Sequence, residues 1–466
     1  MRPWMLTLAL AGAAAAAALL GPARRPSPAT AERPRPEPPI TPTVIEPSGP
    51  SGSLTLSATL DQGVLLAGAD EDRFLLLTVK APEPEADVRM PVDVSIVMDV
   101  SGSMSGWHKI DYARQAAREL VSSLQPGDRV SLVTFSDRAR VLLPAQPVVD
   151  RDGILSAISR IREGGGTNMY DGLTTGLEQL RLGGDGHVRR LLLLSDGHAN
   201  VGISDATSLS RLAGQAALDD VSTSAIGLGL DFNEDLLASM ADSGGGSYHF
   251  VDDAQQLTGI FAEELHTMTR TVARDVTLRL DLPEGVRVAE TYGYTDTSDS
   301  RGWRVYLGDI YAGQERKVVV RLDLPIAEGD TLPLASAGLA YQDLDLGQPI
   351  QATVQVAPRV TRNAATAAAS LDQETAIQAA RAQAAVMAEQ AARAFEARDA
   401  TRARAALART SSLLKQASAD LNAPELMQDE SDYMSALPVY AGASPDSEEG
   451  LRALKVQKEA ARAYAH

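Results

Sequence analysis

Residues 92–104 read VDVSIVMDVSGSM, an apolar run that passes directly into a short polar loop. The apolar part, residues 92–98, is typical of a buried strand in a parallel sheet. The loop then offers a carboxylate from Asp99 and hydroxyls from Ser101 and Ser103, at alternate positions. Such oxygen donors suit Mg²⁺, Mn²⁺ or Ca²⁺ and suit zinc or copper poorly. The segment therefore predicts a site for a hard divalent cation at the end of a strand.

Two later segments supply further oxygen donors. Residues 164–168 read GGGTN, and the apolar run 191–194 is followed by Ser195, Asp196 and Gly197. With these segments, the chain resembles a von Willebrand factor type A domain, whose metal-ion-dependent adhesion site combines D-x-S-x-S with a distant Thr and a distant Asp. All five positions of that site are filled here, by Asp99, Ser101, Ser103, Thr167 and Asp196.

The resemblance implies that these five residues hold Mg²⁺, or Mn²⁺ or Ca²⁺, and leave a coordination position for an Asp or Glu carboxylate of a protein partner. The alternative is that the loops serve the fold alone, with Gly102, Gly166 and Gly197 as tight turns and no metal bound. Near the site, Trp107 and His198 are candidates for a binding surface. The alternatives are that Trp107 packs at the start of the first helix and that His198 is an ordinary loop histidine, which is the favoured interpretation for His198. Asp171 is expected to cap the following helix, or else to orient the site loop.

Between residues 91 and 270 strands alternate with helical patterns, which predicts an α/β Rossmann-like domain with a central, mostly parallel sheet. The expected strands are 92–98, 129–135, 139–143, 190–195, 221–229 and 247–251, and the expected helices are 108–124, 151–162, 169–182, 205–218, 233–242 and 254–270. The second and third strands are so close in sequence that they must form a hairpin, which predicts one antiparallel edge strand. In such sheets ligands bind beyond the carboxyl ends of the strands, where Asp99 and Asp196 fall.

The rest of the chain predicts a multidomain protein. Residues 273–357 consist of short alternating strands separated by turns, which indicates a β-sandwich. Residues 53–90 contain two more strand-like runs, too few to fold alone. We therefore expect these runs to belong to the β-sandwich, so that the α/β domain at 91–270 is an insertion in it.

Beyond the sandwich, residues 358–371 are expected to be a linker and residues 372–466 an α-helical region. Two alanine-rich helical runs are separated near Asp399, which is placed to cap the second of them. A third helical run covers roughly 446–464, and the acidic segment 420–443 between them is expected to be irregular.

The N-terminus predicts export. Arg2 precedes an apolar run at 4–20, and Ala29-Thr30-Ala31 offers a cleavage site, so residues 1–31 form a signal peptide or, if uncleaved, an N-terminal membrane anchor. Residues 32–52 are a proline-rich linker. High Ala and Arg content with a short export signal indicates a bacterial protein of the periplasm or cell envelope.

Composition narrows the function. The 466 residues include 43 basic and 61 acidic side chains, a formal charge of −18, so phosphate-directed binding of nucleic acid is disfavoured. There is no cysteine, which excludes disulfides, thiolate metal sites and cysteine nucleophiles. No familiar catalytic motif is present. The prediction is a non-enzymatic, metal-dependent protein-binding module, against two alternatives: an envelope scaffold with a structural metal, and a metal-assisted hydrolase.

Overall fold

The computed structural model describes residues 52–68, 72–83, 89–183, 186–196, 198–230, 232–299, 302–324 and 335–465. The expected signal peptide or anchor at 1–31, and residues 32–51 of the expected linker, lie outside this range. No helix within the described ranges combines the length and apolarity that crossing a membrane requires.

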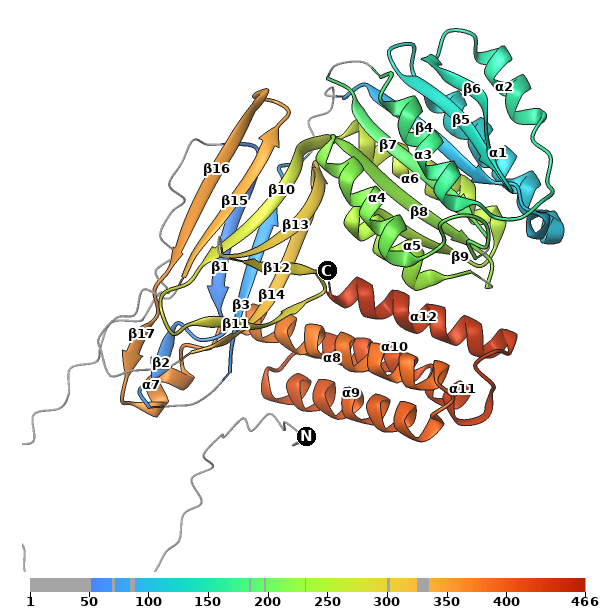
Figure 1. Ribbon diagram of the computed structural model, residues 1–466. Coiled ribbons are helices and arrows are strands. Elements are labelled where there is room, and N and C mark those ends of the chain that lie inside the picture. The colour runs from blue at the N-terminus through green and yellow to red at the C-terminus, as the bar shows by residue number, and fades with distance from the viewer. Residues whose placement is uncertain are drawn as a thin grey trace, which may run out of the picture. The chain divides into compact units, whose positions relative to one another are not determined.

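A six-stranded sheet forms the centre of the α/β domain, with strand order β6-β5-β4-β7-β8-β9 (Figure 1). Its strands are β4 (Val92–Asp99), β5 (Arg129–Phe135), β6 (Ala139–Pro147), β7 (Val188–Ser195), β8 (Val221–Leu228) and β9 (Gly245–Val251). All neighbouring strands pair in parallel except β5 and β6, which form the antiparallel hairpin at one edge. The predicted α/β fold with one antiparallel edge strand is thereby confirmed.

Helices cover both faces of this sheet, because side chains along a strand point alternately to its two faces. Ile96 and Met98 of β4 pack in one core with helices that include α1 (Lys109–Ser123) and α6 (Leu257–Thr269), whereas Val97 packs in the other core with α3 (Met169–Leu180). The remaining helices of this domain are α2 (Arg151–Ser159), α4 (Ala206–Leu218) and α5 (Glu234–Ser243), with short 3₁₀ helices η1 (Gly102–His108) and η2 (Ala254–Gln256). Figure 1 shows α3, α4 and α5 in front of the sheet. The helix predicted at 108–124 corresponds to α1, and the 3₁₀ helix η1 directly precedes it. The chain changes direction between η1 and α1 at His108, whose φ is 57°.

A buried ion network ties α6 to the sheet. The Glu264 carboxylate lies 3.1 Å from Nη1 of Arg190 on β7 and 2.7 Å from Nε2 of His249 on β9. It also accepts a hydrogen bond from the Ser224 hydroxyl on β8, at 2.8 Å. Burial by itself would raise the pKa of Glu264, but these partners outweigh it and lower the pKa to about 2. One charged side chain thereby joins one helix to three strands.

Two further sheets form the β-sandwich, with orders β1-β3-β14-β11 and β12-β13-β10-β15-β16. Their strands are β1 (Thr55–Leu60), β3 (Arg73–Lys80), β10 (Thr271–Asp281), β11 (Arg287–Tyr292), β12 (Asp296–Asp299), β13 (Gly302–Tyr311), β14 (Glu315–Asp323), β15 (Ala335–Asp343) and β16 (Gln348–Val356). Early strand β3 lies between β1 and β14, with Leu77 opposite Val318. Leu75 and Leu77 are fully buried in the core that both sheets share. The α/β domain therefore interrupts the sandwich in sequence, between β3 and β10.

The C-terminal region is helical, with α8 (Gln373–Glu396), α9 (Ala400–Asp420), α10 (Glu425–Met434), α11 (Leu437–Gly442) and α12 (Glu448–Ala465). Asp399 caps α9 by accepting a hydrogen bond from the Arg402 backbone N–H. The expectation that 420–443 is irregular was wrong, because α10 and α11 occupy most of it. Two of the acidic residues there pair with neighbouring helices: Asp429 binds Arg381 at 2.8 Å, and Glu430 accepts a hydrogen bond from Ser411 at 2.6 Å.

The segment 358–371, expected as a linker, also contains regular structure. Strand β17 (Arg359–Thr361) pairs in parallel with β2 (Val64–Leu66), and helix α7 (Ala364–Ala368) follows it. The side chain of Asn363 caps this helix by accepting from the backbone N–H groups of Ala365 and Thr366.

Candidate metal centre

Two of the predicted ligands, Asp99 and Asp196, lie at the carboxyl ends of neighbouring parallel strands. Asp99 is the last residue of β4, and Asp196 follows the last residue of β7, which pairs directly with β4. Both carboxylates are buried, with residue exposures of 0 % and 2 %. Two buried carboxylates beside each other repel unless protons or cations lie between them or near them.

The first loop wraps around the Asp99 carboxylate. One of its oxygens accepts a hydrogen bond from the backbone N–H of Ser101 at 2.8 Å. The other accepts from the hydroxyl of Ser195, at the end of β7, at 2.7 Å. Ser195 was not among the residues predicted for the site, although it directly precedes Asp196 in the sequence.

A row of hydroxyls joins the first loop to the third. The Oγ atoms of Ser101 and Ser103 lie 3.0 Å apart, and the Ser103 hydroxyl donates to Oδ1 of Asp196 at 2.7 Å. Four of the five predicted ligands, Asp99, Ser101, Ser103 and Asp196, therefore belong to one hydrogen-bonded cluster. Its members come from two loops that are more than 90 residues apart in sequence.

The fifth predicted ligand, Thr167, is buried with 3 % exposure and is connected to both other loops through the backbone. On one side, the Gly164 N–H donates to Val100 O at 2.7 Å, and the Gly102 N–H donates to Gly165 O at 3.1 Å. On the other side, Asn200 accepts from the Thr167 N–H through its side chain at 2.9 Å and donates its own N–H to Thr167 O at 3.1 Å.

The glycine at 165 is required by the way this second loop passes the β5–β6 hairpin. Its φ is +94°, a conformation that favours glycine, and a Cβ here would lie 2.8 Å from a carboxylate oxygen of Asp137. The same Asp137 side chain accepts a hydrogen bond from the Gly166 N–H at 2.9 Å. Asp137 thus positions the loop that carries Thr167, a role that the sequence analysis missed.

The two carboxylates of the cluster differ in their electrostatic surroundings. Burial, opposed in part by hydrogen bonds from Ser101 and Ser195 and reinforced by the nearby Asp196 charge, raises the pKa of Asp99 to about 6. The side chain of Asp196 meets a cation from the protein itself, because Nζ of Lys109 lies 2.7 Å from its Oδ2. Lys109 was also missed by the sequence analysis. The sequence feature that could have identified Lys109 is its position, ten residues after Asp99 and at the start of the first helix.

The donor set fits the predicted cation. Mg²⁺ binds oxygens at 2.0–2.1 Å in octahedral geometry, so neighbouring ligand oxygens lie about 3.0 Å apart. The Ser101–Ser103 and Ser103–Asp196 oxygen distances, 3.0 and 2.7 Å, are close to that spacing. In the described part of the chain, the candidate site included, no group of three or more His, Asp or Glu side chains is arranged to hold a metal ion, so a cation here would depend on the hydroxyls as well as on the two carboxylates.

The neighbouring residues singled out from the sequence have different roles. Asn168, not Asp171, caps α3, since its side chain accepts from the Asp171 backbone N–H. The Asp171 carboxylate instead accepts from the Ala139 N–H at 2.7 Å and so holds the first residue of β6. His198 lies in the loop after Asp196, whereas Gly197 and the Trp107 side chain are outside the described residues.

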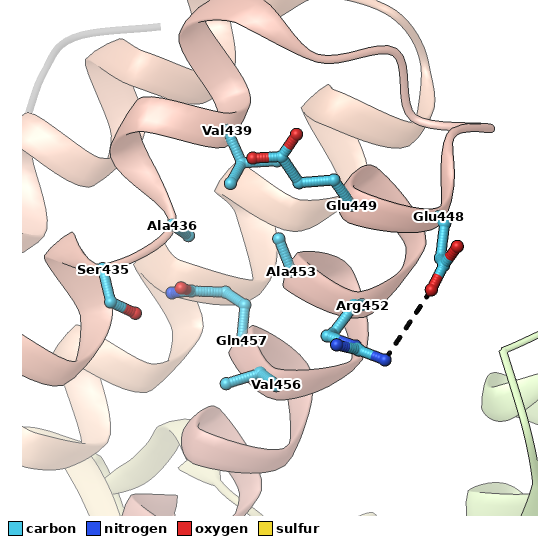
Figure 2. Close-up of a pocket in the computed structure, with 9 residues that line it drawn as sticks. All are labelled: Ser435, Ala436, Val439, Glu448, Glu449, Arg452, Ala453, Val456 and Gln457. Carbon is cyan, nitrogen blue, oxygen red and sulfur yellow. Dashed lines mark ion pairs between the residues drawn. The ribbon is translucent and has the colours of Figure 1, made fainter. Parts of the chain in front are cut away.

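A separate hollow of about 460 Å³ lies in the helical region, between α12 and the segment around α11 (Figure 2). Apolar side chains such as Val439 and Val456 line it, and an ion pair joins Arg452 to Glu448 at 3.9 Å on its rim. This lining of apolar and charged side chains differs from the carboxylate and hydroxyl oxygens of the candidate metal centre.

Residues 93–263 match the family model of the von Willebrand factor type A domain. Among curated proteins, the chain is 28% identical over 320 residues to the uncharacterized protein sll0103 of Synechocystis, covering 65% of this chain and 76% of that protein. It is 27% identical over 263 residues to the uncharacterized protein YfbK of Escherichia coli, covering 55% of this chain and 46% of YfbK. Human inter-alpha-trypsin inhibitor heavy chain H4 is 29% identical to this chain over 202 residues, which cover 41% of this chain and 22% of that protein.

Two solved structures share the fold across most of the chain. The von Willebrand factor type A protein of Catenulispora acidiphila superposes with a TM-score of 0.69 at 18% identity, covering 87% of this chain and 97% of that one. The ArnB paralog VWA2 of Sulfolobus acidocaldarius gives a TM-score of 0.61 at 17% identity, covering 89% and 99%. These likenesses show that a similar fold, with an α/β domain and additional elements, occurs in other proteins.

Proposed function

Because residues 93–263 form a von Willebrand factor type A domain, we propose that this protein is a divalent-metal-dependent protein-binding module of the bacterial cell envelope. The partner offers an Asp or Glu carboxylate, which completes the coordination of the metal. Domains of this family often act as interaction or adhesion modules, and the oxygen donors of the site described above support that role.

The observation that supports the proposal is the hydrogen-bonded set of oxygen donors formed by Asp99, Ser101, Ser103 and Asp196, beside which the loop of Thr167 is held through its backbone. Asp99, Ser101, Ser103, Thr167 and Asp196 would hold Mg²⁺, with Mn²⁺ or Ca²⁺ as the alternatives. Five side-chain oxygens do not fill a six-coordinate shell, so one position remains for water or for a ligand oxygen. A carboxylate is the hard, anionic donor that such a cation prefers among protein side chains.

The proposal assigns no catalysis to the site. A metal-assisted hydrolase needs a general base beside the metal, within hydrogen-bond reach of the attacking water. The two carboxylates of the cluster instead accept hydrogen bonds from Ser195 and Ser103, and Asp196 is also paired with Lys109. Export to the periplasm or envelope is part of the proposal and rests on the N-terminal sequence alone.

Metal binding is tested first, with MgCl₂ and MnCl₂ titrated into the full chain by calorimetry and in thermal unfolding. A cation that binds only the folded site stabilises it by about 2.7 kcal/mol at a hundredfold excess over its dissociation constant. Asp99→Asn should abolish both signals. Asp152→Asn, at an exposed position in α2, should preserve them. Absence of binding heat and of a thermal shift in the unmodified protein would refute the metal site.

Partner binding is tested by affinity capture from bacterial envelope extract, in magnesium and in chelator. The captured protein should be lost in chelator and with Thr167→Ala, and its affinity should fall when one acidic residue on it is neutralised. Surface plasmon resonance measures the affinity for the captured protein in magnesium and in chelator. Equal affinity in magnesium and chelator would contradict metal-mediated capture and leave a scaffold whose metal is structural.

A further inference from the structure

Lys109 places a fixed positive charge beside the candidate metal centre. It is the first residue of α1, directly after the chain reverses at His108. Its Nζ lies 2.7 Å from Oδ2 of Asp196, and only 17 % of its side chain is exposed. The resemblance to the family assigns no role to this position.

The backbone of β8 leaves room for the lysine. Gly229 follows the last residue of β8 with a φ of +88°, and a Cβ there would lie 3.3 Å from Nζ of Lys109. The glycine thus serves two purposes: it allows the left-handed turn, and it keeps the path of the lysine side chain open. The ammonium is therefore placed by the fold of three elements, α1, β7 and β8.

The two oxygens of Asp196 have separate partners. Oδ1 accepts from the Ser103 hydroxyl, on the side of the predicted ligands, and Oδ2 binds Lys109. An ammonium has three donors and no lone pair, so Lys109 itself cannot act as a metal ligand. It can influence the site only through its charge and through the orientation of the Asp196 carboxylate.

The charge balance of the site depends on this lysine. Asp99 and Asp196 together carry two negative charges, which a divalent cation alone would neutralise completely. With Lys109 included, the loaded site carries one net positive charge. Such a site attracts an anionic ligand, and it holds a cation less tightly than the two carboxylates would by themselves.

We propose that Lys109 determines the specificity of the metal centre: it weakens binding of the divalent cation alone and leaves the loaded site in need of one anionic ligand. This inference rests on the proposed function and deepens it. Cation and carboxylate then bind cooperatively, because each one offsets the charge that opposes the other. Lys109 acts through its charge and through the orientation of the Asp196 carboxylate, and it is not itself a metal ligand.

The test compares Lys109→Met, which keeps most of the apolar stem, and Lys109→Arg, which keeps the charge, with the full unmodified chain at pH 8. Lys415→Met, in the C-terminal helices, is the matched control for loss of a paired lysine. Mn²⁺ alone is titrated by calorimetry. Acetate is then titrated into the Mn²⁺-loaded protein, and displacement of metal-bound water is followed by proton relaxation.

We expect Lys109→Met to bind Mn²⁺ at least about tenfold more tightly than the unmodified chain and to lose most of the acetate response. Lys109→Arg and Lys415→Met should keep both properties. Equal or weaker Mn²⁺ binding by Lys109→Met, with the unmodified chain binding Mn²⁺, would overturn the role of Lys109 alone. If neither protein binds Mn²⁺, the proposed function fails with it. Should Lys109→Met not fold, as judged by circular dichroism, Lys109→Gln gives the same comparison.

Discussion

Replacing Glu264 by Gln should destabilise the α/β domain. The substitution removes the negative charge that contacts both Arg190 and His249. The Glu264 side chain is 1 % exposed, and that of Arg190 is 4 % exposed. Breaking a buried ion pair by removing one partner typically costs 3–5 kcal/mol, because the remaining charge stays buried. Asp309, at 3.7 Å from the Arg190 guanidinium, offsets part of that cost, so we expect about 3 kcal/mol.

The pH dependence gives a second route to the same magnitude. The pKa of Glu264 falls from 4.5 to about 2 on folding, despite the opposing effect of burial. A folded pKa below the unfolded value contributes stability that is present above pH 4.5 and is lost as the pH falls toward 2. A shift of this size corresponds to about 3 kcal/mol. The cost of Glu264→Gln should therefore be full at neutral pH and should shrink in acid.

Urea unfolding, followed by circular dichroism at pH 7.5 and at pH 3, provides the assay. Glu263→Gln, at the exposed neighbouring position of the same helix, is the matched control and should change the free energy of unfolding by less than 0.5 kcal/mol, as expected for a surface substitution. The reasoning is refuted if Glu264→Gln differs from this control by under about 1 kcal/mol at pH 7.5, or if the difference does not decrease at pH 3.

Three further outcomes follow from packing, strand pairing and capping. Gly176→Ala places a Cβ 2.4 Å from Cγ2 of Val97 and should cost about 1–3 kcal/mol in urea unfolding, whereas Gly259→Ala, with open space around it, should not destabilise. Deleting residues 52–80 removes β3 from β14 and should cause aggregation, seen by light scattering; a monomeric, cooperatively folded product would contradict the pairing. Asp399→Ala should cost about 1 kcal/mol, and Asp399→Asn should restore most of it; equal losses for both would argue against the cap.

The sequence by itself determined the class of the central domain, because its strands and helices have clearly different apolar patterns. The strands are short continuous apolar runs, whereas the helices repeat apolar residues with the helical period. The apolar run before Asp99 is long enough for a fully buried strand, and the helical pattern at 108–124 predicted the helix that packs in the same core. The candidate ligands were also accessible from sequence. Residues that directly follow parallel strands meet at one edge of the sheet wherever those strands are neighbours.

The identity of helix caps and of short helices was less accessible. Asn168 and Asp171 are both suitable cap residues at nearby positions, and only the backbone geometry shows that Asn168 is used. The helices of the acidic segment 420–443 are short, and contacts with other parts of the chain support them. Arg381 and Ser411, on α8 and α9, pair with its carboxylates and make helix formation favourable there.

Only the tertiary structure decided how the site is completed. Asp196, Thr167 and Asp99 are contacted by Lys109, Asn200 and Ser195, respectively. Asp137 instead holds the loop that carries Thr167, through the Gly166 N–H. These contacts join residues at sequence separations that no local pattern encodes. Local periodicity reports which face of an element is buried, since burial of apolar side chains follows the geometry of a single helix or strand. The partner of a charged side chain depends on which loops the sheet brings together, and that is a property of strand order.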